Sequence, residues 1–239
     1  MSNTYSKFSD VCTKFYDLVL EPQGVADFVY AKIETYQPKN CLFVGGFFLV
    51  ARELEKLGLN IVLTDYSQDM IEEARKRLPN TRAEVADLRE LPFCSEFDAV
   101  LVIGRVFTHM LSPEDASKAL KSVHRALKPG GITLLDNYED SKIQCTDYFN
   151  GRVAVKDADL EIIRDSTTEL ISEQPFVVNW SARYQASSEH GSTEFSDEMK
   201  HRAFSRMEMA ELFEKHGFCV EAQGDNFDET SFYTLGKVN

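Results

Sequence analysis

Two glycines and an acid flank one predicted helix and have the clearest chemical meaning in the sequence. Gly45 and Gly46 follow an apolar strand expected over residues 41–44, and Asp65 ends a second apolar strand expected over residues 60–64. In a doubly wound α/β sheet, such a turn and such a carboxylate meet at the carboxyl edge of the strands. Backbone can approach a ligand closely at glycine, and a carboxylate can accept both hydroxyls of a ribose. The pattern therefore predicts a nucleoside site at this edge.

The elements that must position these residues follow a repeated strand-helix order as far as Asp136. The expected helices and strands alternate along the chain, with helices over residues 49–57, 67–78 and 112–127 and further strands over residues 82–86, 97–103 and 132–136. Ser67 and Ser112 suit N-caps, and Pro113 suits the first helical position. This order predicts a parallel sheet with helices on both faces.

Residues 139–201 break that order. Apolar residues alternate there in short pieces, which predicts two to four antiparallel strands, and the small polar residues 187–193 predict a loop. His190 lies in this loop and His201 follows it, and we expect both to be solvated. A helix that starts at Ser205 and a terminal hairpin complete the chain. The predicted fold is α/β, with a doubly wound Rossmann-like, mostly parallel sheet, a terminal antiparallel hairpin and an inserted small antiparallel β subdomain.

Residues 5–36 read as two amphipathic helices rich in aromatic side chains. They either pack on the core or form a lid that turns a tyrosine toward a ligand. The domain prediction is an N-terminal helical lid (1–36), a Rossmann-like domain (37–138 and 202–239) and inserted strands that form a substrate lid (139–201).

Charge and cysteine usage exclude several classes of partner. The formal net charge of −13 would repel nucleic acid and anionic lipid, so we expect neither as a partner. The five cysteines are scattered and none has CxxC spacing, which argues against a disulfide framework or a structural zinc site. No apolar run reaches membrane-spanning length and the first residues lack a signal-peptide core, which predicts a cytoplasmic protein.

Five stretches, in this order, resemble class I S-adenosylmethionine-dependent methyltransferases. They are the turn of residues 40–49, VLTDYSQDMIEEAR, EVADLRELPF, FDAVLVIGRVFTHML and HRALKPGGITLLD. More loosely, the inserted strands and RAFSRMEMAELFEKHGF are similar to small-molecule N-methyltransferases such as the amino-sugar dimethyltransferases. The resemblance implies S-adenosyl-L-methionine as cofactor and a small-molecule substrate.

It also implies roles for particular residues. Asp65 would hold the ribose, Asp87 would accept from the adenine amino group, and the Leu88 backbone N–H would reach a ring nitrogen. The remaining cofactor-binding positions implied by the motifs are Gly45, Gly46, Tyr66, Met70 and Ile103. Local alternatives stay open: Asp65 as a helix N-cap, Asp87 as a turn acid, and Tyr66 and Met70 as core residues.

The acceptor side of the site is implied by the same motifs. His109 occupies the position where amino-sugar N-methyltransferases carry a substrate-facing histidine, and Tyr16 matches an N-terminal aromatic residue. We expect His109 to orient the substrate or act as a base, the alternative being a structural histidine. Arg105 would hold an anionic substrate group, and Tyr138 and Trp180 would line the pocket.

Asp136 and Asn137 resemble the paired ligands of magnesium-dependent catechol methyltransferases. The third acid of that site is absent, because Gly104 stands in its region. We therefore expect no metal.

The first motif departs from the family pattern of an acid followed by three alternate glycines. The matching residues here are Phe43, Gly45, Phe47 and Leu49. Two bulky residues would displace the methionine end of the cofactor or force a different loop path. Three hypotheses remain: a methyltransferase acting on N or O of a small molecule, a methyltransferase-fold binding or regulatory subunit, and an enzyme that uses a modified sulfonium or catalyses a non-methyl reaction. The edge of the inserted strands would allow a homodimer.

Overall fold

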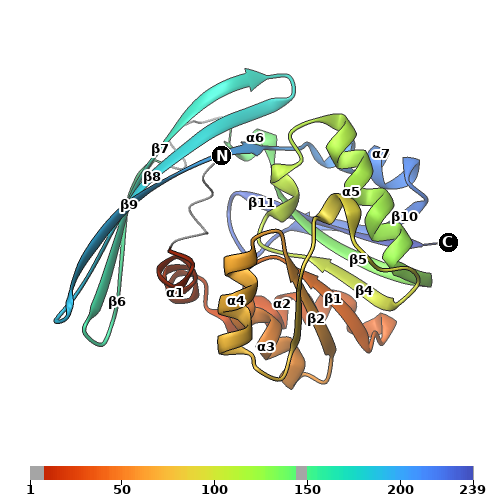
Figure 1. Ribbon diagram of the computed structural model, residues 1–239. Helices are drawn as coiled ribbons and strands as arrows, with labels where there is room; N and C mark the ends of the chain where they lie inside the picture. Colours follow the sequence, from red (N-terminus) through yellow and green to blue (C-terminus); the bar gives the residue numbers. More distant parts are fainter. Residues whose placement is uncertain (1–7, 144–149, 239) are drawn as a thin grey trace.

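A computed structural model describes residues 8–143 and 150–238 and shows two separate β-sheets (Figure 1). Tyr5, part of the first predicted helix, and Cys145 lie outside the described residues.

The larger sheet has seven strands in the order β10-β11-β5-β4-β1-β2-β3. Its strands are β1 (Asn40–Val44), β2 (Asn60–Asp65), β3 (Arg82–Val85), β4 (Phe97–Val102), β5 (Leu127–Tyr138), β10 (Phe218–Asp225) and β11 (Ser231–Val238). The first five strands pair in parallel, whereas β11 runs antiparallel to both β5 and β10. The predicted doubly wound sheet with a terminal antiparallel hairpin is confirmed.

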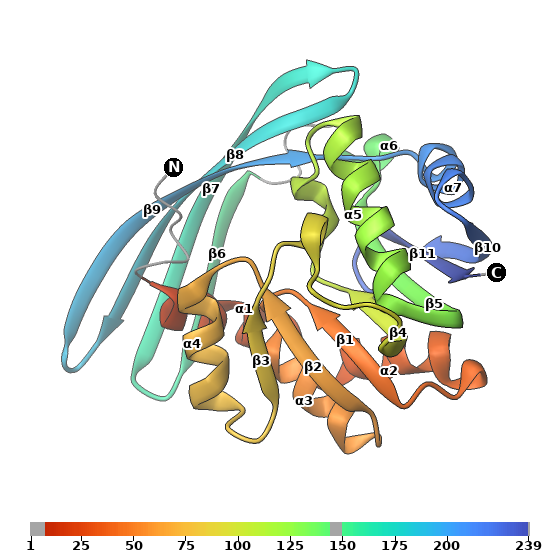
Figure 2. The same cartoon turned by 45° about the vertical axis from the view of Figure 1, so that its right-hand side comes forward.

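Helices cover both faces of this sheet (Figure 2). The helices are α1 (Ser9–Val19), α2 (Pro22–Ile33), α3 (Phe48–Lys56), α4 (Gln68–Arg77), α5 (Pro113–Ala126), α6 (Asp140–Ile143) and α7 (Arg206–Lys215), with short 3-10 helices η2 (Glu34–Tyr36), η3 (Leu88–Glu90) and η4 (Val106–His109). Buried side chains of α2, α3 and α4 form one apolar cluster with the sheet, and those of α5 and α7 form another. The parallel strands are apolar on both faces because both faces are covered.

Three predicted helix starts have the expected capping bonds. Ser67 accepts from the Met70 N–H at 3.4 Å, and Ser112 accepts from the Asp115 N–H at 3.1 Å. The Ser205 hydroxyl likewise accepts from the backbone N–H of Glu208. These bonds satisfy backbone donors that have no partner within the helix.

The second sheet is the predicted insertion, placed between β5 and α7. Its four antiparallel strands are β6 (Gly151–Asp157), β7 (Leu160–Glu173), β8 (Phe176–Ser188) and β9 (Gly191–Arg202). The loop predicted over residues 187–193 is wrong, because the β8–β9 ladder continues to the pair Ser188 and Gly191. Small polar residues can continue a ladder when a neighbouring strand satisfies their backbone groups.

Helix α1 packs against the inner face of the inserted sheet, on the side of the larger sheet (Figures 1 and 2). Phe15 of α1 is fully buried and its ring meets Tyr184 of β8 edge-on at 5.6 Å. The first helix therefore connects the two sheets through aromatic packing. The division of the chain into lid and core domains stays a prediction.

None of the helices in residues 8–143 and 150–238 is long and apolar enough to cross a bilayer. Cys12 and Cys41 are buried free thiols, whereas Cys94 and Cys219 are exposed free thiols.

We expect Gly45→Ala to destabilise the protein by about 2–4 kcal/mol, because the residue has a left-handed backbone and no room for a side chain. Its φ is 123°, and a Cβ there would lie 2.8 Å from the Ile103 carbonyl oxygen. The matched control is Gly24→Ala in α2, where no atom lies within 4 Å of the added Cβ and a stabilisation of up to about 1 kcal/mol is expected. Chemical denaturation of the two variants measures the difference, and equal midpoints would contradict the argument.

Candidate functional site

The β1 turn comes very close to the ends of β2 and β4. A Cβ on Gly45 would lie 2.7 Å from a Val106 methyl group, and one on Gly46 would lie 2.3 Å from the Met70 methyl group. The sulfur-bearing side chain of Met70 is buried beside this turn. Close packing and a positive φ therefore require glycine at position 45, whereas a side chain at position 46 would have to displace the end of Met70. Both glycines leave backbone at the edge of the sheet.

Asp65 ends β2 beside this turn. One carboxylate oxygen accepts a 2.8 Å hydrogen bond from the Ser67 N–H, so the carboxylate does contact the start of α4. Its other oxygen faces Gly46, at 3.7 Å from where a Cβ would stand. Burial raises the pKa of Asp65 to about 6, which hydrogen bonds from the Ser67 and Tyr66 backbones only partly oppose. A buried carboxylate with one oxygen directed at a glycine turn is suited to accept ligand hydroxyls.

Two residues predicted to lie beside that carboxylate differ in their exposure to solvent. The Tyr66 side chain is largely exposed, at 67%, whereas Met70 belongs to the core cluster. Ile103, at the end of β4, is also buried. Of these three residues, only Tyr66 presents its side chain to solvent.

Asp87 has a partner that the sequence reasoning missed. Both of its oxygens accept from the Arg89 guanidinium, with a shortest distance of 2.6 Å, and one also accepts from the Arg89 N–H. This pairing lowers the pKa of Asp87 below its ordinary value, despite partial burial. Arg89 also bonds Asp115 at the start of α5. A ligand amino group at Asp87 must therefore share the carboxylate with a guanidinium.

Phe47 takes the place of the second glycine of the family pattern. Its ring lies over Gly104, where a Cβ would stand 3.0 Å from the ring, and its centroid is 6.2 Å from the Tyr16 ring. Leu49, at the third position, is already inside α3. The Phe47 ring therefore lies across the end of β4.

Asp136, in β5, binds the backbone that directly follows β4. Its carboxylate accepts from the backbone N–H groups of Gly104 at 3.1 Å and Arg105 at 2.7 Å, and from the Asn226 amide at 3.1 Å. Complete burial raises the pKa of Asp136 to about 6, although the Arg105 charge acts in the opposite direction. The acid that resembles a metal ligand in the sequence accepts hydrogen bonds from the backbone of Gly104 and Arg105 in the structure.

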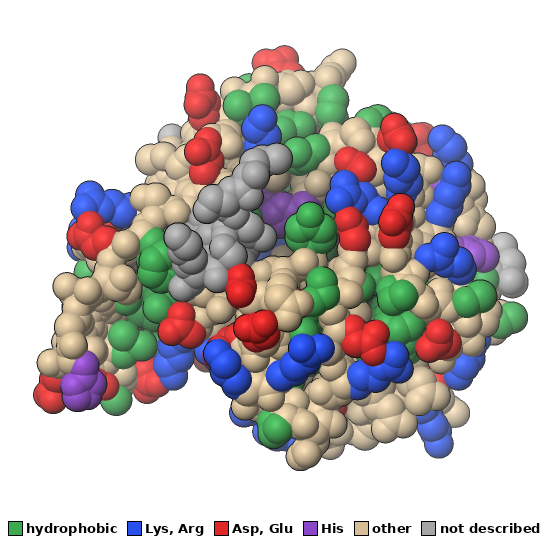
Figure 3. Space-filling model, viewed as in Figure 1, with side chains coloured by type: hydrophobic (Ala, Val, Ile, Leu, Met, Phe, Trp, Pro, Cys, Tyr) green, Lys and Arg blue, Asp and Glu red, His purple; other side chains and the backbone are tan. Residues whose placement is uncertain are grey.

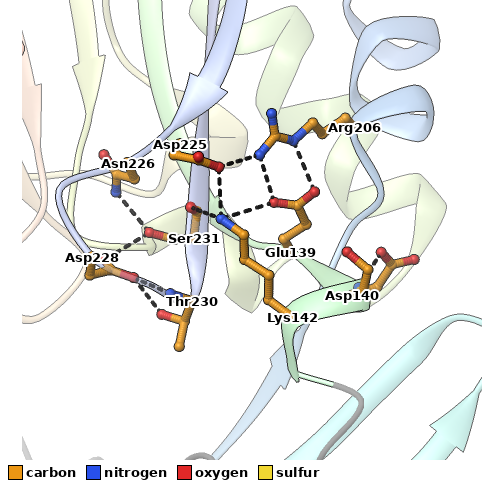
Figure 4. A network of polar contacts seen from close by, with 10 residues as sticks. Glu139, Asp140, Lys142, Arg206, Asp225, Asn226, Asp228, Thr230 and Ser231 are labelled. Carbon is orange, nitrogen blue, oxygen red and sulfur yellow. Dashed lines mark hydrogen bonds and ion pairs between the residues drawn. The ribbon is translucent and has the colours of Figure 1, made fainter.

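The predicted anion ligand Arg105 already has an acidic partner. Its guanidinium pairs with Asp228 of the β10–β11 loop and lies 5.4 Å from the Tyr138 ring centroid. Figure 4 shows Asp228 held in turn by Thr230 and Ser231, within a polar network at the ends of β5, β10 and β11. This loop gave no sequence signal, because only the fold brings it beside β4.

His109 ends η4 and is exposed at the same edge. Desolvation by the surrounding protein lowers the pKa of its imidazole below the ordinary value, an effect that the nearby Lys200 backbone partly opposes. Lys200 lies in β9, so the inserted sheet contacts the loop that follows β4. Histidine side chains lie in the hollow between the two sheets (Figure 3). A neutral imidazole here can accept a proton.

The prediction that His201 is solvated is wrong, whereas His190 is exposed at the β8–β9 turn as expected. The His201 ring is partly buried, with its centroid 5.1 Å from His109, 5.6 Å from Tyr138 and 6.2 Å from Trp180. The error arose because the ladder extends farther than the composition suggested, which puts His201 on the inner face of β9. The fold thus brings together His109, Tyr138 and Trp180, which the sequence had proposed separately.

Tyr16 lies farther along this space, on α1. The centroid of its ring is 5.5 Å from that of Phe15. Burial is the main cause that raises the pKa of the nearby Tyr184, and Tyr16 adds to it. An open groove of about 730 Å³ lies away from this sheet edge, between α1, α3 and α4. Charged groups on its walls pair with one another, as Arg77 does with Asp17 and Lys56 with Glu53. We therefore place the candidate site at the sheet edge.

No set of three acidic, histidine or cysteine side chains in the described part of the chain is placed to bind a metal ion. Asn137, the other predicted member of that pair, is buried on the opposite face of β5, and neither of its amide atoms has a hydrogen-bond partner there.

Comparison with known proteins now identifies the domain. Residues 46–131 match the methyltransferase domain family. The chain carries a class I S-adenosylmethionine-dependent methyltransferase domain. The resemblance inferred from the motifs is therefore confirmed.

Two curated relatives of this methyltransferase domain are named for different activities. A glycine/sarcosine N-methyltransferase of Parasynechococcus marenigrum is 32% identical over 55% of this chain and 50% of its own length. A carboxy-S-adenosyl-L-methionine synthase of Shewanella loihica is 28% identical over 59% of this chain and 54% of its own length. The chain thus spans about half the length of these curated relatives.

Solved structures share the fold over nearly the whole chain. DesVI of Streptomyces venezuelae superposes with a TM-score of 0.82 at 21% identity, covering 98% of this chain and 99% of its own. CalS10 of Micromonospora echinaspora, an amino pentose methyltransferase solved with S-adenosylmethionine bound, has a TM-score of 0.77 at 20% identity and full coverage of both chains. These likenesses include the inserted sheet and concern the fold alone.

The residues at this edge fit the cofactor that the family implies. The two glycines leave backbone exposed to a ligand, and the free oxygen of Asp65 is directed toward them. The Phe47 ring narrows the site at its end next to β4, and the Arg89 guanidinium already occupies part of the Asp87 carboxylate. The ribose end is therefore the most completely formed part of the site.

We expect the affinity for S-adenosylhomocysteine to fall as the pH decreases through about 6, because protonated Asp65 loses the charge that accepts the ribose hydroxyls. One pH unit below that pKa, about 90% of the carboxyl is protonated, so the expected loss is about tenfold. Calorimetric titrations between about pH 7.5 and pH 5 measure it. Asp65→Asn is the control and should bind weakly at every pH. An unchanged wild-type affinity would contradict an ionised Asp65 as the ribose acceptor.

Proposed function

We propose that this chain is an S-adenosylmethionine-dependent methyltransferase that acts on a nitrogen of a small molecule. The observation that carries the proposal is the position of His109, an uncharged imidazole beside the end of β4, between the glycine turn and the inserted sheet. An oxygen acceptor would use the same base. Nitrogen is favoured by relatives named as glycine/sarcosine and amino pentose methyltransferases.

The cofactor supplies a methyl group on a sulfonium, which needs an aligned nucleophile more than covalent help. Gly45, Gly46 and Asp65 would hold its nucleoside, with the Leu88 backbone at the adenine. Phe47 and Tyr16 would form the wall next to the reacting atoms. Tyr138 and Trp180 would line the substrate pocket together with Arg105, whose pairing with Asp228 fixes its position.

His109 would accept the proton that the acceptor nitrogen loses when it gains the methyl group. A base is useful here because an amine is nucleophilic only while its lone pair is free. The lowered pKa leaves the imidazole uncharged at neutral pH, so one of its two ring nitrogens can accept.

A second candidate function is favoured by one observation. The Phe47 ring occupies space next to β4 that glycine leaves open in the family pattern. A cofactor with an altered sulfonium substituent would need a changed wall at this point, and one relative is a carboxy-S-adenosyl-L-methionine synthase. A binding or regulatory subunit without transfer activity is the third reading.

The remaining expectations belong to the same proposal. We infer a cytoplasmic protein without nucleic acid or membrane partners, supported by its net charge of −13. We also infer that the chain forms a homodimer through the edge of the inserted sheet. Helix α1 and that sheet would act as a lid.

Calorimetry with S-adenosylmethionine and S-adenosylhomocysteine, followed by a transfer assay on small amines, tests the function. We expect micromolar binding, and for His109→Asn a decrease in kcat of about 10²–10⁴-fold with the cofactor affinity unchanged. His190→Asn, on the exposed turn, is the matched control. If the folded chain binds neither compound, the ordinary methyltransferase function is wrong.

A further inference from the structure

His201 is the best-placed polar side chain of the site without an assigned role. It comes from β9 of the inserted sheet, whereas His109 comes from the loop after β4. Their ring centroids lie 5.1 Å apart. The His201 ring also lies near the rings of Tyr138 and Trp180.

Hydrogen bonds fix which nitrogen of His201 carries the proton. The Thr108 hydroxyl donates its only hydrogen to the Arg105 carbonyl at 2.7 Å. The 3.1 Å contact between His201 Nδ1 and that same hydroxyl oxygen therefore requires Nδ1–H as the donor. In the uncharged ring, Nε2 then has a free lone pair.

His109 offers an acceptor nitrogen from the other side. An uncharged imidazole carries only one N–H, so its second ring nitrogen is an acceptor in either tautomer. Burial, His109 and Arg105 all lower the pKa of His201 well below its ordinary value. Both rings are thus uncharged acceptors at neutral pH.

The spacing of the two rings suits a single nitrogen atom. Two acceptors that each lie about 2.9 Å from one tetrahedral nitrogen are about 4.7 Å apart. The two ring centroids are 5.1 Å apart, and the range of separations that this allows between their nitrogen atoms includes that value. An acceptor with only one hydrogen would leave one of the two imidazoles without a partner.

The charges around the pair favour an uncharged amine. The Arg105 guanidinium lies 5.4 Å from the Tyr138 ring centroid, and that of Arg164 lies 5.6 Å from Trp180. Arg105 is paired with Asp228, and the Nε of Arg164 has no hydrogen-bond partner among the described residues. The Arg105 charge still lowers the pKa of the neighbouring His201, and it disfavours an ammonium ion in the same way. An ammonium ion also has no lone pair to attack a methyl group.

We propose that His201 and His109 form a two-acceptor site that binds both N–H groups of one uncharged primary amine. This inference rests on the proposed function and specifies it: His201 is the residue that orients a primary amine, and His109 is the one that takes its proton. A secondary amine would still satisfy one imidazole, so a second methylation is possible but less dependent on His201.

A series of small amines tests the site without methyl transfer. Trifluoroethylamine and its N-methyl and N,N-dimethyl derivatives stay largely uncharged near neutral pH and offer two, one and no N–H donors. Trp180 is the only tryptophan of the chain and lies 6.2 Å from His201, so its fluorescence reports binding directly. The titrations use the full chain with S-adenosylhomocysteine and, separately, without it.

We expect the wild-type affinity to fall by about tenfold for each N–H that is removed. His201→Phe keeps a ring but removes the acceptor, so the primary and N-methyl amines should bind it equally. His190→Phe, on the same hairpin, should behave as the wild type does.

Equal wild-type affinity for all three amines, or no saturable response to any of them, would overturn the proposal. A long-range nitrogen–proton NMR spectrum of the wild type gives a second test that does not depend on a variant folding. It should show His201 protonated at Nδ1, and protonation at Nε2 would overturn the proposal. Failure of cofactor binding alone would reject the methyltransferase function and leave these amine measurements interpretable.

Discussion

The buried carboxylate of Asp136 sets the geometry of the candidate site. It accepts two consecutive backbone N–H groups, those of Gly104 and Arg105, and so turns the chain away from the sheet directly after β4. Arg105 takes a left-handed conformation there, with φ 61°. The short helix η4 follows at once, and it carries Thr108 and His109. Without this acceptor, two buried backbone donors would lack partners, at a cost of about 1–3 kcal/mol each.

The same carboxylate joins the terminal hairpin to the site. Asn226 donates to it, and Asp228 pairs with the Arg105 guanidinium. The loop between β10 and β11 is thereby fixed against the loop after β4. A change far along the chain can therefore alter the position of His109 without touching any ligand.

The inserted sheet supplies the other half of the site. Its strand β9 meets η4 through the hydrogen bond between His201 and Thr108 and through the contact between the rings of His201 and His109. The insertion thus orients His201 as well as covering the sheet edge. Because the acceptor groups come from two sheets, the identity of the substrate depends on how these sheets meet.

At the β1 turn, two glycines are followed by a phenylalanine that depends on a third glycine. Gly45 and Gly46 face atoms that a Cβ would strike. Phe47 is accommodated because Gly104, opposite it, has no side chain. The absence of a side chain at Gly104 is thus a physical reason why this turn can carry a bulky residue.

The sequence by itself determined the fold, the insertion point and the positions of Asp65 and His109. Strand and helix periodicities and the capping serines are local properties, so they can be read from short stretches of sequence. The tertiary structure alone decided that His201 lies beside His109, that Arg89 engages Asp87 and that Asp228 neutralises Arg105. In two of these pairs the residues are far apart along the chain, and the third depends on a side-chain direction. Periodicity carries no information on long-range contacts or on side-chain directions, because the packing of the elements against one another sets both.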